Sequence, residues 1–322
     1  MDVFNTPVRR KTAVDQVQIP ASPFLKKIGY GTGVAVYEMV RSPVYCKSRS
    51  PWAVKKLVHK QKNNVELNKR IKEEADVLRQ LKHPNIVAFK AFAKDADGRN
   101  ILVMEECSSC LGDMIENRSS PYSAKTIVQV MRDMATALHY LHNEALMMHC
   151  DVKSYNILVK GNFTICKLCD FGICLPVTKK GEVDLTKAGT EVEYVGTAAW
   201  SAPEILKYPQ EITTKADVYA LGLVIWEMIA LAPPVDEEFV SSFNLSFDDS
   251  QVSINTIDNT LESSNVENLR SRPPLPNIDL STEYNTVLEI FYCCTDVERD
   301  QRPTAEDIMV ILQEANKNVC CK

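Results

Sequence analysis

The first third of the chain carries short runs in which β-branched and other apolar residues alternate with polar ones. This pattern predicts β-strands. Val34, Val36 and Val54 belong to such runs between residues 24 and 57, and the pattern returns over residues 85–103. We therefore expect a β-sheet in this part of the chain.

Apolar residues at helical spacing predict two amphipathic helices. One covers residues 68–81, and a longer one follows Ser123, which we expect to be its N-cap. In both segments an apolar residue recurs every three or four positions, as one buried helix face requires. The apolar positions are Ile71, Ala75, Leu78 and Leu81 in the first helix, and Ile127, Val130, Met131, Met134, Leu138 and Leu141 in the second.

Two further helices are predicted in the second half of the chain. Val218–Ile229 is apolar nearly all round, which is typical of a buried helix. Residues 304–315 form the last predicted helix, because Thr304 and Asp307 have the spacing of a helix-capping pair. A strand-rich first third and a helix-rich remainder together predict an α+β fold of two lobes.

The boundary between the lobes falls near residues 105–107. We expect a flexible tail over residues 1–23, an N-lobe with its hinge over 24–106, a C-lobe over 107–316, and a C-terminal tail over 317–322.

Composition and charge narrow the class of protein. Of the 322 residues 45% are hydrophobic and 25% are charged, with a formal net charge of −5. This balance is ordinary for a globular protein and argues against direct nucleic-acid binding, which favours a basic surface. No signal peptide is apparent, and the apolar run Val218–Leu231 is interrupted by Glu227 and too short for a membrane span. We expect a cytoplasmic protein that does not bind membranes.

The eleven cysteines form an odd count, which fits reduced thiols. Two C-x-x-C pairs leave a zinc site open as an alternative. The pairs are Cys107 with Cys110 and Cys166 with Cys169. We favour the interpretation that these thiols are small apolar residues in the packing.

One long stretch lacks positive charge. No Lys or Arg occurs between Ala216 and Leu269, and residues 236–269 are acidic and rich in Ser and Asn. This composition predicts an inserted, mobile acidic loop. It is either a solvated loop without a role or a docking surface for a basic partner.

Three features of the first lobe suggest phosphate chemistry, although each is common by itself. Gly29, Gly31 and Gly33 lie between two predicted strands, where glycine lets backbone amides approach phosphate oxygens. Lys55 follows on a predicted strand and has the right charge to pair with phosphates. Glu74 lies on the predicted helix 68–81, from which it can hold Lys55 in an ion pair.

A second group of motifs is far more specific, because its members occur in a fixed order. They are the H-x-D-x-K-x-x-N pattern of residues 149–156, Asp170-Phe171-Gly172, Ala202-Pro203-Glu204, Asp217 with Gly222, and Arg302. Together with the glycine-rich run, Lys55 and Glu74, they make the chain resemble the eukaryotic protein kinase family. The resemblance implies the two-lobed protein kinase fold and transfer of the ATP γ-phosphate to protein hydroxyls.

The resemblance implies roles for the residues that carry the reaction. Asp151 would orient the substrate hydroxyl and accept its proton, and Lys153 would steady the γ-phosphate. Lys55 would contact the phosphates and Glu74.

The same resemblance implies the nucleotide and metal sites. Asn156 and Asp170 would bind Mg²⁺, a hard cation that takes few protein ligands beside phosphate oxygens. Asp217 would anchor the backbone near Asp151, and Glu204 would pair with Arg302. The residues expected at the ATP site are Gly29, Gly31, Gly33, Val36, Ala53, Lys55, Met104 as gatekeeper, Glu105 and Cys107 in the hinge, and Cys169.

Substrate type follows from two further positions. Lys153, two residues after Asp151, is the pattern of serine/threonine kinases, and Thr197 would form the floor of the substrate pocket. Dual specificity stays open. The alternative is a pseudokinase scaffold that docks partners through the acidic insert. Two departures from the family pattern favour it: Val34 replaces the third glycine, and Cys150 replaces the arginine before Asp151. The presence of every catalytic residue argues against it; these are Lys55, Glu74, Asp151, Asn156 and Asp170.

A closer resemblance is to a mitotic serine/threonine kinase similar to the MAP kinase kinases. The matching segments are Ile19–Phe24, Gly31–Val34, Ser50–Lys56 and Arg272-Pro273-Pro274. This resemblance implies MAP kinase or histone-like substrates, phosphorylation of Thr6 by a cyclin-dependent kinase, and a place in the nucleus or on the mitotic apparatus as well as the cytoplasm. The ending Cys320-Cys321-Lys322 is not an apolar PDZ ligand, which argues against PDZ binding.

Overall fold

The computed structural model describes residues 25–31, 33–44, 47–189, 192, 194–207, 212–234 and 272–320. The N-terminal tail with Thr6, the acidic insert 236–269 and the last two residues lie outside the described residues. The expectations for these segments therefore stay predictions.

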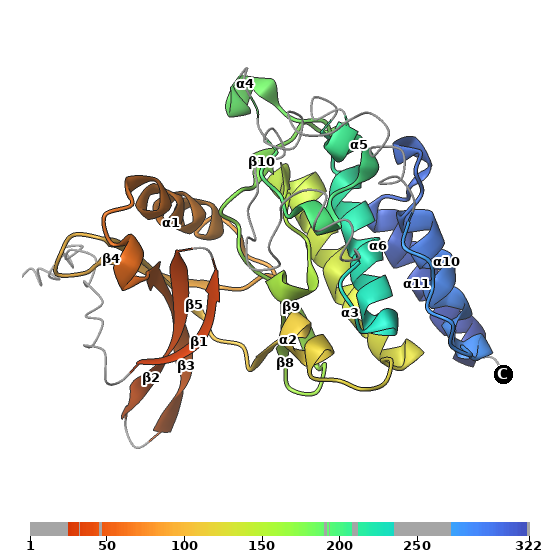
Figure 1. Ribbon diagram of the computed structural model, residues 1–322, viewed down its shortest axis with the longest axis horizontal. Helices are drawn as coiled ribbons and strands as arrows, with labels where there is room; N and C mark the ends of the chain where they lie inside the picture. The colour runs from red at the N-terminus through yellow and green to blue at the C-terminus, as the bar shows by residue number, and fades with distance from the viewer. Residues whose placement is uncertain are drawn as a thin grey trace, which may run out of the picture.

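The strand-rich part forms one five-stranded antiparallel sheet in the order β1-β2-β3-β5-β4, with one helix, α1, beside it (Figure 1). Its elements are β1 Leu25–Gly31, β2 Val34–Val44, β3 Lys47–Leu57, α1 Val65–Leu78, β4 Phe89–Lys94 and β5 Asn100–Glu105. The strands predicted within residues 24–57 and 85–103 are present, although β4 begins only at Phe89 and β5 continues to Glu105.

Alternation along the strands gives this sheet two different faces. Val54 and Val103 belong to a small outer cluster, whereas their neighbours Ala53 and Leu102 join the main core. The main core also contains the buried face of α1, including Ile71. The face of the sheet that carries Ala53 therefore looks towards α1 and the rest of the molecule.

Helix α1 begins and ends three residues earlier than predicted. The side chain of Asn64 accepts a hydrogen bond from the backbone amide of Leu67 across 3.0 Å and so caps the helix at Val65. At the other end Leu81 is buried but lies beyond the last helical residue, Leu78. The apolar spacing thus located the buried face correctly, while the cap decided where the helix starts.

The remainder of the described chain is mainly helical, with short strands beside the sheet-bearing lobe (Figure 1). The helices are α2 Leu111–Glu116, α3 Ala124–His139, α4 Leu185–Ala188, α5 Pro203–Lys207, α6 Lys215–Ala230, α10 Asn285–Cys294 and α11 Ala305–Cys320, and a π-helical turn covers Tyr140–Ala145. The short strands are β6 Ser109–Cys110, β7 Met147–Met148, β8 Ile157–Lys160, β9 Ile165–Leu168 and β10 Leu175–Pro176. This arrangement is the predicted α+β fold of two lobes.

The predicted helix caps of this lobe are confirmed. The hydroxyl of Ser123 accepts from the amide of Thr126 at the start of α3. Thr304 and Asp307 exchange side-chain and backbone hydrogen bonds at the start of α11, as in a capping box. Helix α11 extends to Cys320, beyond the end predicted at Ala315 and into the segment expected as a tail.

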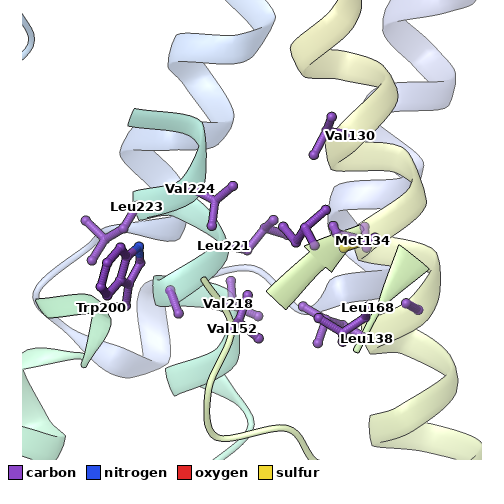
Figure 2. Close-up of a cluster of buried hydrophobic side chains, with 14 of the residues drawn as sticks. Val130, Met134, Leu138, Val152, Leu168, Trp200, Val218, Leu221, Leu223 and Val224 are labelled. Carbon is purple, nitrogen blue, oxygen red and sulfur yellow. The ribbon is translucent and has the colours of Figure 1, made fainter. Parts of the chain in front are cut away.

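The core of this lobe lies between α3 and α6 (Figure 2). Helix α6 is buried on all sides from Ala216 to Ile229, as its uniformly apolar sequence predicts. Met134 and Leu138 of α3 and Leu221 of α6 fill the space between the helices, and Val152 rests on the same cluster. The loop that contains Val152 is therefore packed against the buried core between α3 and α6. No helix within the described ranges is long and apolar enough to cross a membrane.

Candidate functional site

Lys55, Glu74 and Asp170 meet although they come from distant parts of the sequence. The Nζ of Lys55, on β3, lies 2.8 Å from Oε2 of Glu74 on α1 and 2.9 Å from Oδ1 of Asp170. The ion pair that the sequence predicted between Lys55 and Glu74 is present. Asp170 adds a second carboxylate to the same ammonium group.

These three groups shift one another's ionisation. Burial alone would lower the pKa of Lys55, but the carboxylates of Asp170 and Glu74 raise it well above its ordinary value. Burial opposes ionisation of Asp170, yet the positive charge of Lys55 lowers its pKa. Burial raises the pKa of Glu74 to about 7 in spite of Lys55. Lys55 and Asp170 therefore carry opposite charges at neutral pH.

The sheet places four of the other predicted nucleotide residues on the face that carries Lys55, namely Gly29, Val36, Ala53 and Met104. Gly29 pairs with Val36, and Val36 with Lys55, in one row across three strands. Ala53 lies opposite Met104 in a second row two residues along β3. Side chains two residues apart on a strand share a face, so these positions lie on one side of the sheet.

Two further predicted nucleotide residues, Gly33 and Glu105, lie in a turn and at the end of a strand. Gly33 has φ +80°, a left-handed backbone conformation that glycine adopts without strain. The carboxylate of Glu105, at the end of β5, lies 3.0 Å from Nζ of Lys160 and 3.1 Å from Nζ of Lys167. These two pairs join β5 to β8 and β9 of the helical lobe.

A second polar cluster surrounds Asp151. The hydroxyl of Thr197 donates to Oδ1 of Asp151 across 2.6 Å, and Nζ of Lys153 lies 2.9 Å from its Oδ2. The same Nζ donates to Oγ1 of Thr197 across 2.6 Å. Asn156 Nδ2 donates to both the backbone oxygen and Oδ2 of Asp151, at 2.8 Å each. The four predicted residues form one hydrogen-bonded unit.

Backbone contacts connect the two clusters. The amide of Cys169 donates to the carbonyl of Asn156 across 3.0 Å, and a ring nitrogen of His149 lies 3.0 Å from the carbonyl of Cys169. Asp170, the next residue, has φ +66°, an uncommon conformation that Asp tolerates better than most residues. The side chain of Asp170 therefore contacts Lys55, while the backbone of Cys169 is hydrogen-bonded to the loop that carries Asp151.

Asp170 and Asn156 have the donor atoms that a hard cation requires. Nδ2 of Asn156 is occupied by Asp151, and no described residue donates to its Oδ1. Oδ1 of Asp170 accepts a hydrogen bond from Nζ of Lys55, and the second carboxylate oxygen can serve as a metal ligand. An amide oxygen and a carboxylate oxygen are typical Mg²⁺ ligands, so these residues fit that ion.

Asp217 anchors the backbone beside Asp151, as predicted. Its carboxylate accepts from the amides of His149 and Cys150, at 2.8 and 2.9 Å, and Nε2 of His142 lies 2.8 Å from Oδ2. Burial acts against the charge of Asp217, but the contact with His142 helps to lower its pKa below the ordinary value. A buried carboxylate thus holds the loop in place.

The predicted pair of Glu204 and Arg302 is also present. Both guanidinium ends of Arg302 donate to the Glu204 carboxylate, each across 2.7 Å, and the arginine side chain is fully buried. This bidentate pair joins α5 to the segment just before α11.

Sequence analysis missed the role of Glu227, which lies in the middle of α6. Its carboxyl group accepts from Oγ of Ser154 across 2.7 Å and from Nε1 of Trp200 across 2.8 Å. Burial raises the pKa of Glu227 to about 8. The signal was in the sequence, because this glutamate interrupts an otherwise apolar run, and a buried carboxyl group requires partners.

The alternative of a zinc site is not supported. Within the described ranges no group of three or more His, Cys, Asp or Glu side chains is placed to hold a metal ion. Burial raises the pKa of Cys107 to about 11 and that of Cys166 to about 12, so both stay protonated thiols. These residues behave as small packing groups.

The fold and this arrangement of charged residues are those of a protein kinase. The protein kinase domain family matches residues 23–311, and the chain belongs to that family. It is an ATP-dependent protein kinase.

Individual relatives agree with this class. The chain is 38% identical over 310 residues to the lymphokine-activated killer T-cell-originated protein kinase of Homo sapiens. The matched region covers 92% of this chain and 91% of that protein. It is 32% identical over 176 residues to the mitogen-activated protein kinase kinase kinase zak-1 of Caenorhabditis elegans, covering 51% of this chain and 22% of that protein. The dual specificity protein kinase shkD of Dictyostelium discoideum is 26% identical over 315 residues, 96% of this chain and 37% of that protein.

Proposed function

We propose that this kinase transfers the γ-phosphate of ATP to serine and threonine hydroxyls of protein substrates, with Asp151 as the residue that receives the hydroxyl proton. The observation that carries the proposal is the unit of Asp151, Lys153 and Thr197. It presents a carboxylate, an ammonium group and a hydroxyl within 2.6 to 2.9 Å of one another. A substrate hydroxyl that enters this unit meets a base and a positive charge together.

Asp151 suits the role of base because its surroundings hold it in one orientation. Thr197 contacts Oδ1 of the carboxylate and Lys153 contacts Oδ2, and Nδ2 of Asn156 donates a further hydrogen bond to Oδ2. A substrate hydroxyl would take over part of this hydrogen bonding and pass its proton to Asp151. Lys153 would neutralise charge on the moving phosphoryl group, since positioning and charge neutralisation are the main demands of this reaction.

On the sheet-bearing side, Lys55 would hold the ATP phosphates and Glu74 would hold Lys55. Gly29, Gly31 and Gly33 would lie over the phosphates. The adenine would lie between the lobes, beside Val36, Ala53, Met104 and Cys169, with the backbone of Glu105 to Cys107 as its hinge contact.

Asn156 and Asp170 would hold Mg²⁺. The ion would supply a positive charge that orients the phosphates and offsets their negative charge. The depressed pKa of Asp170 supports this role, because the carboxylate stays ionised over the whole physiological range. Lys55 already compensates one of its oxygens and would remain beside the phosphates.

Similarity to the human kinase extends the proposal to the biological setting. We infer MAP kinase or histone-like substrates, phosphorylation of Thr6 by a cyclin-dependent kinase, and action in mitosis from the cytoplasm, nucleus or mitotic apparatus. The sequence features behind this inference are the proline that follows Thr6 and the segments shared with that kinase class. The proposed division of the chain is a tail over 1–23, an N-lobe over 24–106 and a C-lobe over 107–316.

Phosphoamino-acid analysis tests the proposed acceptor and metal. The full chain is incubated with γ-labelled ATP, Mg²⁺ and a generic basic protein, with and without a chelator, next to the Asp170→Asn variant. We expect label on Ser and Thr that requires Mg²⁺ and is absent in the variant. Label confined to Tyr, or transfer unaffected by both chelator and variant, would contradict the proposal.

A further inference from the structure

We propose that Asn68 and Asn100 are positioning residues, which hold α1 against the sheet so that Glu74 reaches Lys55. The proposal rests on the function proposed above for Lys55 and Glu74. Neither asparagine belongs to a motif that the sequence analysis singled out.

The two asparagines form a reciprocal pair between α1 and β5. The backbone amide of Asn100 donates to Oδ1 of Asn68 across 2.8 Å, and Nδ2 of Asn100 donates to the backbone oxygen of Asn68 across 2.7 Å. Asn100 is only 6% exposed. Each bond satisfies a polar group that the packing of α1 on the sheet removes from water, so the pair forms only when the helix is in this position.

The asparagine pair joins α1 to β5, and the ion pair of Lys55 and Glu74 joins the same helix to β3. Asn100 lies on β5 two residues before Leu102, and Leu102 is directly opposite Lys55 on β3. Asn68 and Glu74 lie six residues apart on α1, about 9 Å along the helix axis at 1.5 Å per residue. Two neighbouring strands thus hold one helix at two separate points.

Two attachment points restrict the helix far more than one. The apolar face of α1, which includes Ile71, already packs into the core beside the sheet. The hydrogen bonds at Asn68 add a directional contact near the start of the helix, which restricts its rotation and its distance from β5 beyond what apolar packing and Glu74 provide. The position of Glu74 then follows from the fold and does not depend on the long side chain of Lys55 alone.

The glycine-rich turn depends on the same end of α1. A Cβ atom built on Gly33 would collide with Cδ1 of Leu67, the residue before Asn68. The turn and the first part of the helix are therefore in close contact. A helix released at Asn68 would also change the space in which this turn sits.

Exposed ion pairs on α1 do not have this effect. Lys72 and Asp76 lie 2.9 Å apart, but their side chains are 59% and 45% exposed, and both belong to the helix itself. Such a pair stabilises a helix weakly and does not connect it to the sheet. It provides a matched control.

The first test compares Asn68→Leu with Asn68→Asp. Leucine has a similar size but removes the acceptor oxygen, whereas aspartate keeps an acceptor at the start of a helix, where a negative charge is favourable. We expect Asn68→Leu to lower kcat about tenfold or more, Asn68→Asp to stay within about threefold of the unaltered chain, and Lys72→Ala to leave kcat unchanged. If Asn68→Leu keeps full kcat, the proposal is wrong.

The second test separates positioning from general loss of structure. Glu74→Gln is introduced into the unaltered chain and into Asn68→Leu, and kcat is measured for all four proteins. If the asparagine pair acts through Glu74, the second substitution costs much less in the Asn68→Leu background than alone. Equal, multiplicative costs in both backgrounds would overturn the proposal. No effect of Glu74→Gln in the unaltered chain would instead refute the role proposed for Glu74.

A variant at the other residue covers the case in which Asn68→Leu does not fold. Asn100→Asp keeps the size and the backbone amide but loses the Nδ2 donor to the carbonyl of Asn68. We expect a folded protein, judged by its thermal transition, with the same reduced kcat and the same weakened effect of Glu74→Gln. Full kcat in this folded variant would contradict the proposal.

Discussion

Oγ of Ser154 donates a hydrogen bond to Oε1 of Glu227 across 2.7 Å and so joins the loop that carries Asp151 to the middle of α6. Nε1 of Trp200 donates to the other carboxylate oxygen across 2.8 Å. One buried carboxyl group therefore holds the loop of Asp151 and the segment of Thr197 at the same time. The two sides of the acceptor site keep their spacing because they share this anchor.

The raised pKa of Glu227 predicts a pH-dependent stability. Its pKa is about 8 in the folded chain against an ordinary value of 4.5, so its contribution to stability is present below about 4.5 and is lost as pH rises through 8. Urea unfolding between pH 5 and 9 should show that the unaltered chain loses stability relative to Glu227→Gln as the pH rises. Parallel pH profiles for the two proteins would exclude a raised pKa.

Removing the hydroxyl of Thr197 should impair the reaction more than it impairs folding. Thr197→Val keeps the shape of the side chain but removes the oxygen that contacts Asp151 and Lys153, each across 2.6 Å. We expect kcat to fall about 100-fold, because the base and the ammonium group lose their common partner. Thr197→Ser restores the oxygen and serves as the control, with kcat near that of the unaltered chain. Similar rates for Val and Ser at this position would show that the hydroxyl is not needed.

Gly196 should not tolerate a side chain. An ideal Cβ at this position would lie 2.7 Å from the backbone oxygen of Cys150 and would also collide with the ring of Tyr194. Gly196→Ala must therefore move the segment of Thr197 away from the loop of Asp151. Steady-state kinetics should show a lower kcat with little change in KM for ATP. Gly98→Ala is the control: no atom lies within 4 Å of an added Cβ there, although its φ of +78° strains the backbone, and we expect kcat to stay unchanged.

The pair of Glu204 and Arg302 should act on stability and not directly on chemistry. Arg302 is buried and bound at both ends of its guanidinium group, so Glu204→Gln leaves a buried positive charge without its partner. Breaking such a pair costs about 3–5 kcal/mol in unfolding free energy. Denaturant unfolding measures this loss, and Lys69→Ala, at an exposed ion pair of α1, provides the comparison. A loss no larger than that of Lys69→Ala would show that the pair is dispensable.

Much of the site could be predicted because its motifs combine residue type with order along the chain. Lys55 and Glu74 were predicted to pair, and the kinase pattern placed Asp170 in the same site, but the contact of Asp170 with Lys55 was not predicted. The contacts of Asn68 with Asn100, and of Ser154 with Glu227, could not be predicted in this way. They join ordinary polar residues from different elements, and nothing local to either residue indicates its partner.

Element boundaries show a related limit. Apolar spacing located the buried face of α1 through Ile71 and Leu78, but Asn64 starts the helix earlier than that spacing suggests. An N-cap side chain starts a helix by accepting a hydrogen bond from a backbone amide of the first turn. The spacing of apolar residues carries no information about this hydrogen bond. The length of α11 was underestimated for a comparable reason, since the capping pair at Thr304 indicates only where that helix begins.

The measurement that tests the account most directly is phosphate transfer from labelled Mg-ATP to a basic protein by the unaltered chain and by Asp151→Asn. The variant keeps the size of the side chain and replaces only the carboxylate that we propose as the acceptor of the hydroxyl proton. We expect transfer by the unaltered chain and a loss of kcat in the variant, while ATP binding by both stays the same. Equal transfer by the two proteins would contradict the role of Asp151. ATP binding without transfer by the unaltered chain would point to a scaffold.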